Sequence, residues 1–363
     1  MSFRIKITEP LLPDTSKLLS LMGDILKSGN ITNNGSVHQQ FEKALAVSQN
    51  SAHCSLVCNA TVGLMIALRA VDAKDKVITT PFSFAATSGV LEFLDVEPVF
   101  CDISENSPNI DTNEVSKVFA KDVSAVLPVH CYGIACDVTA FEELCNAERI
   151  KLVYDAAHCI SRTVNSKSIF DYGDASVVSL HATKILTSVE GGAIFAKNTE
   201  TNERIRKMRN FGISGVDRIS DLGINGKMSE FHAAVGLLNL EGLEAALNKR
   251  KLIAKHYYKH LNSKALRVIN EHSSNNFGYF PVRFSTQKNR DDVYNSLYSN
   301  GILSRKYFSP LLSSRYNYDS KIMFPNAYSF VNTVLCLPIH ANLSICEVDE
   351  IIDIVNSNLN DHF

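Results

Sequence analysis

The feature that most constrains the fold is the alternation of strand-like and helix-like runs along the first two thirds of this 363-residue chain. Short apolar runs predict buried strands, and the stretches between them carry apolar residues at helical spacing. Strands joined by single helices pair in parallel, so we expect an α/β layered domain around a mostly parallel sheet. The expected strands are 76–80, 97–102, 125–130, 150–155, 175–180 and 193–195, and the expected helices are 59–73, 87–93 and 138–147.

The last third of the chain has a different pattern. Residues 230–261 predict one long helical stretch that breaks near Gly242 and connects two lobes. Beyond it, the pattern predicts strands at 277–284 and 334–339 and helices at 291–300 and 346–357. We therefore expect a large domain over residues 1–235 and a smaller α+β domain over residues 236–363.

Composition excludes several classes of protein. Hydrophobic residues make up 45% and charged residues 20%, with a net charge of −2, as in ordinary globular proteins. No basic face predicts nucleic-acid binding, and no apolar stretch is long enough for a membrane span. The start of the chain lacks the apolar core of a signal peptide, so we expect a cytoplasmic protein. The nine cysteines include no C-x-x-C pair, which predicts reduced thiols and no metal site.

Two residues at strand ends point to chemistry. Asp155 ends one predicted strand, and Lys184 follows another by a few residues. The carboxyl ends of parallel strands meet at one edge of a sheet, where His130 is also expected. A lysine and an aspartate are the groups that pyridoxal phosphate needs, one for a Schiff base and one to keep the pyridine nitrogen protonated. On spacing alone, Lys184 is equally a solvated lysine, and Asp155 a helix N-cap.

Other residues fit the same cofactor. Ala60 and Thr61 open a predicted helix, whose unpaired N–H groups favour a phosphate, although Asn or Thr there also serves as a cap. The Ser179 hydroxyl can also bind a phosphate. Phe84 follows a strand and can stack on a flat ring, or belong to the core. His158 lies near Asp155 and can bond the ring hydroxyl, or be a satisfied buried histidine.

Taken together, the motifs resemble the DegT/DnrJ/EryC1/StrS family of nucleotide-sugar aminotransferases, which are fold-type-I pyridoxal-phosphate enzymes. Each motif alone is weak, but their order and spacing are specific and extend over nearly the whole chain. The matching segments are 31–35, 41–42, 58–61, 77–81, 128–133, 154–158, 179–184, 190–192 and 223–230.

The resemblance implies a role for each matching position. It implies that Lys184 forms the Schiff base and that Asp155 pairs with the pyridine nitrogen. Asn225 matches an asparagine that reaches the phosphate from the neighbouring subunit, which implies a homodimer with shared active sites. The other implied cofactor contacts are Ala60, Thr61 and Ser179 at the phosphate, Phe84 on the ring and His158 at the ring hydroxyl.

Finer features concern the substrate. His181 and the segment Glu190-Gly191-Gly192 are similar to the branch of the family that aminates position 4 of the sugar. The start of the chain and residues 337–342 are similar to dTDP-4-amino-4,6-dideoxyglucose transaminases. This similarity implies L-glutamate as donor and dTDP-4-keto-6-deoxyglucose as acceptor, in amino-sugar biosynthesis such as that of O-antigen. The expected substrate contacts are His181, Lys227, Tyr307 and His340.

The sequence also departs from the family pattern and leaves alternatives. Lys227 stands where the family commonly has arginine, and it keeps the charge without the planar fork. Ile185 stands where many relatives have asparagine. A 3-keto sugar aminotransferase and a sugar dehydratase of the same family remain open, although known dehydratases replace the lysine by histidine. A non-enzymatic protein with this fold is a third alternative, which no basic stripe supports.

Overall fold

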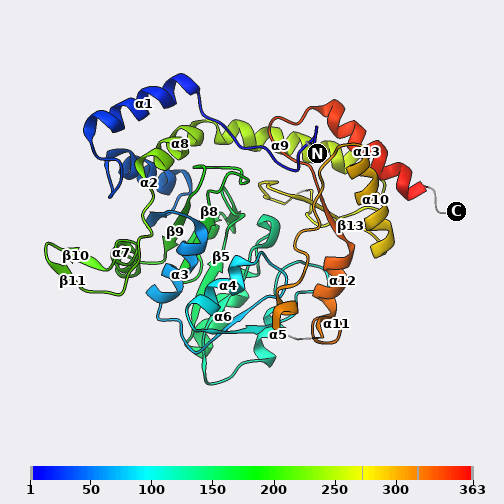
Figure 1. Ribbon diagram of the computed structural model, residues 1–363. Coiled ribbons are helices and arrows are strands. Elements are labelled where there is room, and N and C mark those ends of the chain that lie inside the picture. The colour runs from blue at the N-terminus through cyan, green and yellow to red at the C-terminus, as the bar shows by residue number, and fades with distance from the viewer. Residues whose placement is uncertain (1–2, 272, 317–318, 361–363) are drawn as a thin grey trace.

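The structure is a computed structural model that describes residues 3–271, 273–316 and 319–360. In this part of the chain, a seven-stranded sheet of order β1-β9-β8-β5-β4-β2-β3 forms the centre of the larger lobe (Figure 1). Its strands are β1 (Cys54–Val57), β2 (Lys76–Thr79), β3 (Glu97–Phe100), β4 (Val123–Leu127), β5 (Lys151–Asp155), β8 (Ala175–Ser179) and β9 (Gly192–Ala196). The strands predicted from the apolar runs are therefore confirmed, with ends that differ by at most three residues, whereas β1 was not predicted.

Helices cover both faces of this sheet. The prediction of helices before and after β2 and after β4 is confirmed, whereas α1, α2, α5 and α7 were not predicted. The helices of the larger lobe are α1 (Thr15–Ser28), α2 (Ser36–Ser48), α3 (Ala60–Ala70), α4 (Ala86–Phe93), α5 (Thr112–Lys117), α6 (Val138–Glu148), α7 (Thr199–Met208) and α8 (Glu230–Glu241).

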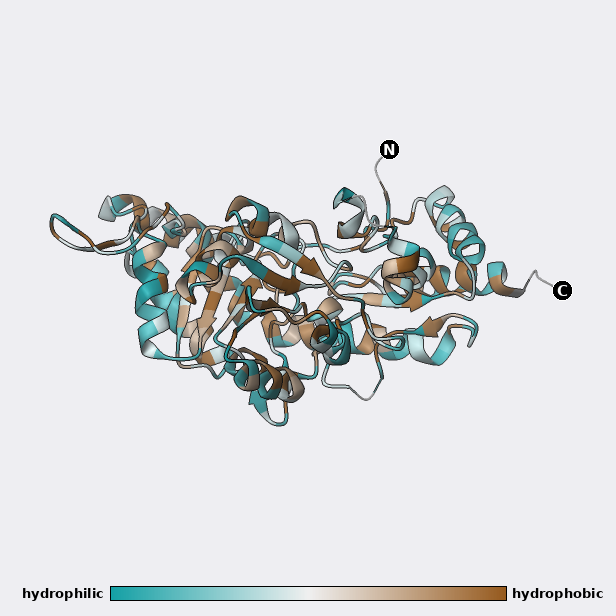
Figure 2. Ribbon diagram, turned by 90° about the horizontal axis from the view of Figure 1, so that it is seen from below, coloured by the Kyte–Doolittle hydropathy of each residue, from teal (hydrophilic) through white to brown (hydrophobic). Residues whose placement is uncertain are grey.

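The side chains of each strand alternate between two cores, as the twofold period of a strand requires. In β5, Val153 belongs to the core that α3, α4 and α7 cover. Its neighbours Leu152 and Tyr154 belong to the opposite core, which α2, α6 and α8 cover. The central strands are buried on both faces, which explains why they read as continuous apolar runs in the sequence (Figure 2).

One strand of the sheet runs against the others. β9 is antiparallel to both β8 and β1, while β8, β5, β4, β2 and β3 pair in parallel. The connection from β8 to β9 therefore leaves and re-enters the sheet at the edge where the parallel strands end. That connection, residues 180–191, carries Lys184.

The smaller lobe contains a three-stranded antiparallel sheet, β12-β13-β14. The predicted helical stretch 230–261 does break at Gly242, and α9 then joins the two lobes, because Leu243 packs in a core of the large lobe and Ile253 in that of the small one. The elements are α9 (Leu243–His260), β12 (Leu266–Arg267), β13 (Phe280–Arg283), α10 (Gln287–Ser299), α11 (Ser320–Met323), α12 (Pro325–Thr333), β14 (Val334–Leu337) and α13 (Ile345–Asn360).

The beginning of the chain packs with the smaller lobe. Ile5 forms an isolated bridge with Ile302 and lies in the core around β13 and β14. The division at residue 235 remains a prediction, and this contact adds a segment of the first domain to the core of the second.

Short hairpins and turns complete the described fold. The β10–β11 hairpin extends from one end of the molecule, beyond α7 (Figure 1). No helix among the described residues combines the length and apolar character needed to cross a membrane. The short elements are β6 (Thr163–Val164), β7 (Lys167–Ser168), β10 (Ile213–Gly215), β11 (Arg218–Ile219), η1 (Cys131–Gly133), η2 (Ile169–Asp171) and η3 (Leu312–Tyr316).

A buried ion cluster links α2 and α7 to the end strand β1. Glu42, on α2, accepts hydrogen bonds from Arg209 at 2.6 Å, from the Leu56 N–H at 2.9 Å and from Arg206. The side chains of Glu42 and Arg209 are only 7% and 6% exposed. Burial opposes the charge of Glu42, but the two arginines outweigh it, so the pKa of Glu42 is lowered. The cluster therefore holds a charged carboxylate inside the protein.

We expect Glu42→Gln to destabilise the fold by about 3 kcal/mol, because removing one partner of a buried ion pair leaves the other charge uncompensated. Chemical denaturation measures this free energy of unfolding. The matched control is Glu350→Gln, which breaks an exposed pair with Arg4 and should have a much smaller effect. Equal losses in the two variants would show that the buried cluster adds no stability.

Candidate active site

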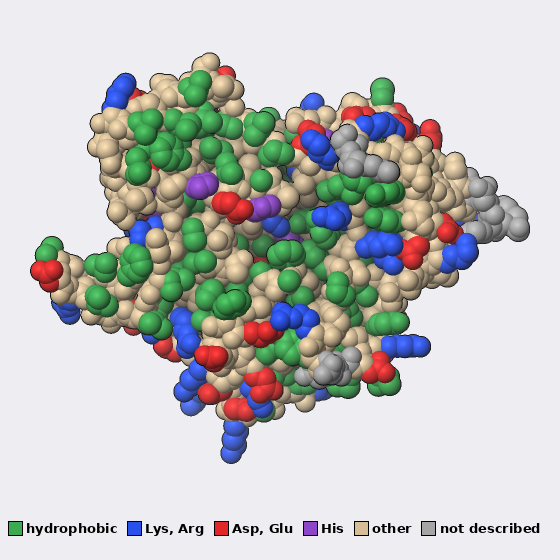
Figure 3. Space-filling view, in the orientation of Figure 1, with side chains coloured by type: hydrophobic (Ala, Val, Ile, Leu, Met, Phe, Trp, Pro, Cys, Tyr) green, Lys and Arg blue, Asp and Glu red, His purple; other side chains and the backbone are tan. Residues whose placement is uncertain are grey.

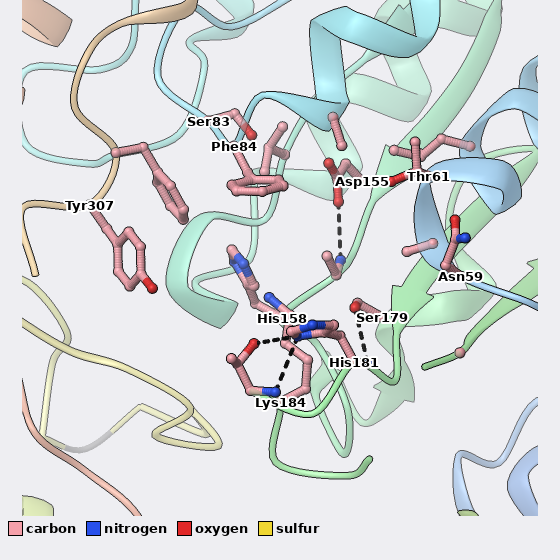
Figure 4. A pocket seen from close by; sticks show the side chains of 18 of the residues that line it. Asn59, Thr61, Ser83, Phe84, Asp155, His158, Ser179, His181, Lys184 and Tyr307 are labelled. Carbon is pink, nitrogen blue, oxygen red and sulfur yellow. Dashed lines mark hydrogen bonds between the residues drawn. The ribbon is translucent and has the colours of Figure 1, made fainter. Parts of the chain in front are cut away.

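One cavity of about 300 Å³ opens at the carboxyl edge of the large sheet. Figure 4 shows the labelled side chains around it, and the space-filling view shows histidine, acidic and basic side chains gathered near the middle of this face (Figure 3). Of the residues predicted from the sequence, nine line this cavity: Ala60, Thr61, Phe84, Asp155, His158, Ser179, His181, Lys184 and Tyr307.

The N-terminus of α3 forms one wall. The Asn59 side chain caps the helix by accepting a hydrogen bond from the Val62 N–H at 2.9 Å. Ala60 and Thr61 of this first turn line the cavity, and a helix N-terminus favours a phosphate. Strand β9 approaches this turn closely because Gly192 has no side chain: a Cβ there would lie 2.8 Å from the Ala60 nitrogen.

Asp155 ends β5 and is held by two donors. The Thr87 hydroxyl, from α4, donates to Asp155 Oδ2 at 2.7 Å, and the Ala157 N–H donates to Oδ1 at 3.2 Å. Ser83 in turn lies 2.7 Å from the Thr87 hydroxyl. Burial raises the pKa of Asp155, and the Thr87 bond, the Ala157 bond and the charge of Lys184 act in the opposite direction. Thr87 was not predicted, although it lies one helical turn after Phe84.

Lys184 lies on the β8–β9 connection. Burial lowers its pKa to about 8, and the negative charge of Asp155 opposes this shift. Its Nζ donates a hydrogen bond to the Tyr279 hydroxyl at 3.1 Å. The described ion pairs do not join Lys184 to Asp155, so the two groups face the cavity from separate positions. The lowered pKa increases the fraction of unprotonated amine, which is the form that attacks an aldehyde.

Aromatic rings line the other walls. Phe84 is 60% exposed, which is unusual for a phenylalanine and leaves its face open to the cavity. The ring of His158 stacks on that of Phe308, with 5.8 Å between their centroids. Its Nδ1 accepts a hydrogen bond from the Tyr132 N–H at 3.2 Å. Burial and the charge of Lys184 lower the pKa of His158 well below its usual value. The ring is therefore neutral.

Four predicted residues lie elsewhere. The prediction that His130 lies at the cavity is wrong. Its ring is fully buried and stacks on Tyr154, with 4.4 Å between the ring centroids, and burial lowers its pKa to about 3. The backbone of His130 lies at the carboxyl edge of the sheet, but its ring points into the core. His340 is buried in the smaller lobe, outside the cavity lining, and remains a prediction as a substrate contact.

Asn225 and Lys227 also lie outside this cavity. Lys227 Nζ donates to Asn225 Oδ1 at 2.7 Å and lies 4.4 Å from the centroid of the Phe211 ring. Lys227 lines a separate hollow of about 230 Å³ with Arg206 and Arg209. The roles of Asn225 and Lys227 in a shared site remain predictions.

The residues present fit pyridoxal phosphate. A flat ring has Phe84 available as a stacking face, Asp155 as a buried carboxylate for its nitrogen, and Lys184 as an amine for its aldehyde. The first turn of α3 and Ser179 supply donors for its phosphate. Among the described residues, no cluster of three or more His, Cys, Asp or Glu side chains can hold a metal ion. Fold and site together define a pyridoxal-phosphate-dependent enzyme.

Comparison with known proteins gives the family. The model of the DegT/DnrJ/EryC1/StrS aminotransferase family matches residues 14–356. The chain belongs to this family and is a pyridoxal-phosphate-dependent sugar aminotransferase. The resemblance inferred from the motifs is thereby confirmed.

Individual relatives agree with this assignment over almost the whole chain. The dTDP-4-amino-4,6-dideoxy-D-glucose transaminase of Escherichia coli is 37% identical over 354 residues, which cover 94% of this chain and 95% of that protein. The protein of the same description from Shigella dysenteriae is 34% identical over 348 residues, with the same coverage. The crystal structure of DesI in the presence of its TDP-sugar product is 29% identical, with a TM-score of 0.90 and coverage of 96% of this chain and 91% of that one.

The hydroxyl of Thr87 gives a prediction about cofactor affinity. Thr87→Val keeps the shape of the side chain but removes the bond to Asp155, which raises the pKa of that carboxyl and weakens its pairing with a pyridinium. A hydrogen bond to a charged group is worth about 1.5–3 kcal/mol, so we expect the dissociation constant for pyridoxal phosphate to rise at least about tenfold. Thr87→Ser keeps the hydroxyl and should bind as the parent does. Equal affinity of all three proteins would contradict the role of Thr87.

The lowered pKa of Lys184 gives a pH dependence. Only the unprotonated amine attacks an aldehyde, so covalent uptake of pyridoxal phosphate by cofactor-free protein should speed up as pH rises and level off above about 8. Stopped-flow absorbance measures this rate. A rate that continues to rise to pH 10.5, the ordinary pKa of lysine, would show that burial does not shift Lys184.

Proposed function

We propose that this protein transfers the amino group of L-glutamate to a nucleotide-linked 4-keto-6-deoxy sugar, with dTDP-4-keto-6-deoxyglucose as the acceptor. The observation that carries the proposal is the placement of Lys184 and Asp155 on one cavity in a chain of this family. The names of the Escherichia coli and Shigella dysenteriae relatives support the choice of sugar. The product belongs to amino-sugar biosynthesis, such as that of O-antigen.

In this proposal Lys184 Nζ would hold the cofactor covalently through its aldehyde, and Asp155 would hold the pyridine nitrogen in its protonated form. When bound, the cofactor supplies an electron sink and carries the amino group from donor to acceptor. When its amine is free, Lys184 would take the proton from the Cα of glutamate and would serve afterwards as a general acid. Because its pKa is lowered to about 8, the amine is suited to both tasks near neutral pH.

The polar groups at the opening of the cavity are the proposed sugar contacts. The Thr183 N–H donates to His181 Nδ1 at 3.2 Å, and His181 Nε2 lies 3.6 Å from Glu190 Oε1. Both side chains are about half exposed and line the cavity, so they can reach sugar hydroxyls. Tyr307 enters from the smaller lobe. His181 and Glu190 also support amination at position 4 over position 3.

A homodimer with shared active sites is part of the proposal. Asn225 and Lys227 lie outside the cavity of their own chain, on the part of the surface near α7 and the β10–β11 hairpin. If they bind the cofactor or substrate phosphates, they do so in a second subunit. His340 is buried, and its proposed contact with substrate requires a change in the smaller lobe.

An amination assay tests the function. Purified protein is incubated with glutamate and each of dTDP-, UDP- and GDP-linked keto sugars, and NMR of the product gives the position and configuration of the new amine. We expect 2-oxoglutarate and the 4-amino dTDP sugar in equal amounts, with ping-pong kinetics. A dehydrated sugar formed without glutamate consumption would favour the dehydratase, and a 3-amino product the other aminotransferase branch.

Lys184→Ala should lower turnover by at least about 10³-fold, because both the covalent attachment and the general base are lost. The absorbance of the bound cofactor, tested before and after borohydride reduction, reports the loss of attachment independently. The control is Lys288→Ala, an exposed lysine on α10 that should keep parental activity. Turnover of Lys184→Ala at the parental rate would refute the mechanism.

A further inference from the structure

The amine of Lys184 has a partner that comes from the other lobe. Its Nζ lies 3.1 Å from the hydroxyl of Tyr279 and 5.6 Å from the centroid of that ring. Tyr279 directly precedes β13 of the smaller lobe, whereas Lys184 is on the β8–β9 connection of the larger one. The contact therefore joins the reacting nitrogen to a part of the fold that supplies none of the predicted cofactor contacts.

Three other rings hold Tyr279 in place. The ring of His158 meets it edge to face at 4.6 Å, Tyr132 lies 5.6 Å away and Tyr307 lies 5.9 Å away. His158 and Tyr132 belong to the larger lobe, and Tyr307 to the smaller one. Packing on several sides restricts the rotamers of Tyr279 and directs its hydroxyl towards the lysine.

Burial, together with the neighbouring titratable groups, keeps the Tyr279 phenol neutral. Burial, followed by the proximity of Tyr307, Cys336 and Cys131, raises the pKa of Tyr279 well above its ordinary value, and Arg250 opposes this only in part. The charged and titratable groups that face Lys184 are Asp155, Cys131, Cys159 and His158. A neutral phenol accepts a hydrogen bond from an ammonium and donates one to an amine, so it bonds Lys184 in both protonation states.

We propose that Tyr279 is the positioning residue for the free amine of Lys184. Its hydroxyl holds Nζ in place while the amine is detached from the cofactor, both before it takes the proton from the donor Cα and after it has done so. Because the hydroxyl comes from the smaller lobe, the position of that lobe determines whether the base is aligned. The inference rests on the proposed function, because it concerns Lys184 in the form that the proposed aminotransferase reaction releases from the cofactor.

A pair of tyrosine variants tests the proposal. Tyr279→Phe removes the hydroxyl and keeps the ring. Tyr258→Phe is the matched control, because it removes another hydroxyl of the smaller lobe, one that donates to the Ile269 carbonyl at 2.7 Å and lies outside the cavity. Tyr279→Leu, which also lacks the hydroxyl, is the second variant if the phenylalanine variant does not fold.

The first measurement needs no turnover. The pH dependence of pyridoxal phosphate uptake by cofactor-free protein gives the pKa of Lys184. The hydrogen bond from the charged ammonium is stronger than the one to the neutral amine, so loss of the hydroxyl should lower this pKa further, by about one pH unit in Tyr279→Phe, and leave it unchanged in Tyr258→Phe. A merely structural role for Tyr279 would not produce this shift.

The second measurement follows the half-reaction with glutamate in a stopped-flow instrument. Tyr279→Phe should slow it about tenfold or more, with KM for glutamate within about twofold of the parent and a larger isotope effect with α-deuterated glutamate, because proton transfer becomes slower. Tyr258→Phe should match the parent. A parental pKa and rate in Tyr279→Phe would overturn the proposal while leaving the aminotransferase function intact. A parent protein that moves no amino group would instead overturn the function.

Discussion

The common edge at which the parallel strands end is the constraint on which the site depends. β5 and β8 pair in parallel, so Asp155 and Ser179 reach this edge as neighbours. β9 then returns antiparallel to β8, and its direction brings the connection that carries Lys184 back to the same edge. The lysine and the carboxylate thus face one cavity because of strand direction, not because they are near each other in sequence.

Burial also determines the protonation states in the site, because it shifts the pKa values of Lys184 and Asp155 in opposite directions. It lowers the pKa of Lys184 to about 8, which favours the reactive amine, and it raises the pKa of Asp155, which opposes the charge that a pyridinium needs. The Thr87 hydroxyl and the Ala157 N–H offset the second effect. A buried lysine and a buried carboxylate therefore need different neighbours to reach useful protonation states.

The two lobes contribute differently to the cavity. The larger lobe supplies the groups proposed to hold the cofactor, and the smaller lobe supplies Tyr279, Tyr307 and Phe308. α9 joins the lobes, and Ile5 ties the start of the chain to the smaller one. The proposed bond between Tyr279 and Lys184 would make the alignment of the base sensitive to this packing.

The sequence by itself determined the parallel strands, the family and nine of the residues that line the cavity. Buried strands read as apolar runs, and the residues that follow strand ends, such as Asp155 and Phe84, are found by position along the chain. The tertiary structure decided the rest, because orientation beyond a strand end is set by packing between distant segments. It turned the His130 ring into the core, placed Thr87 against Asp155, and brought Tyr279 from another lobe to Lys184.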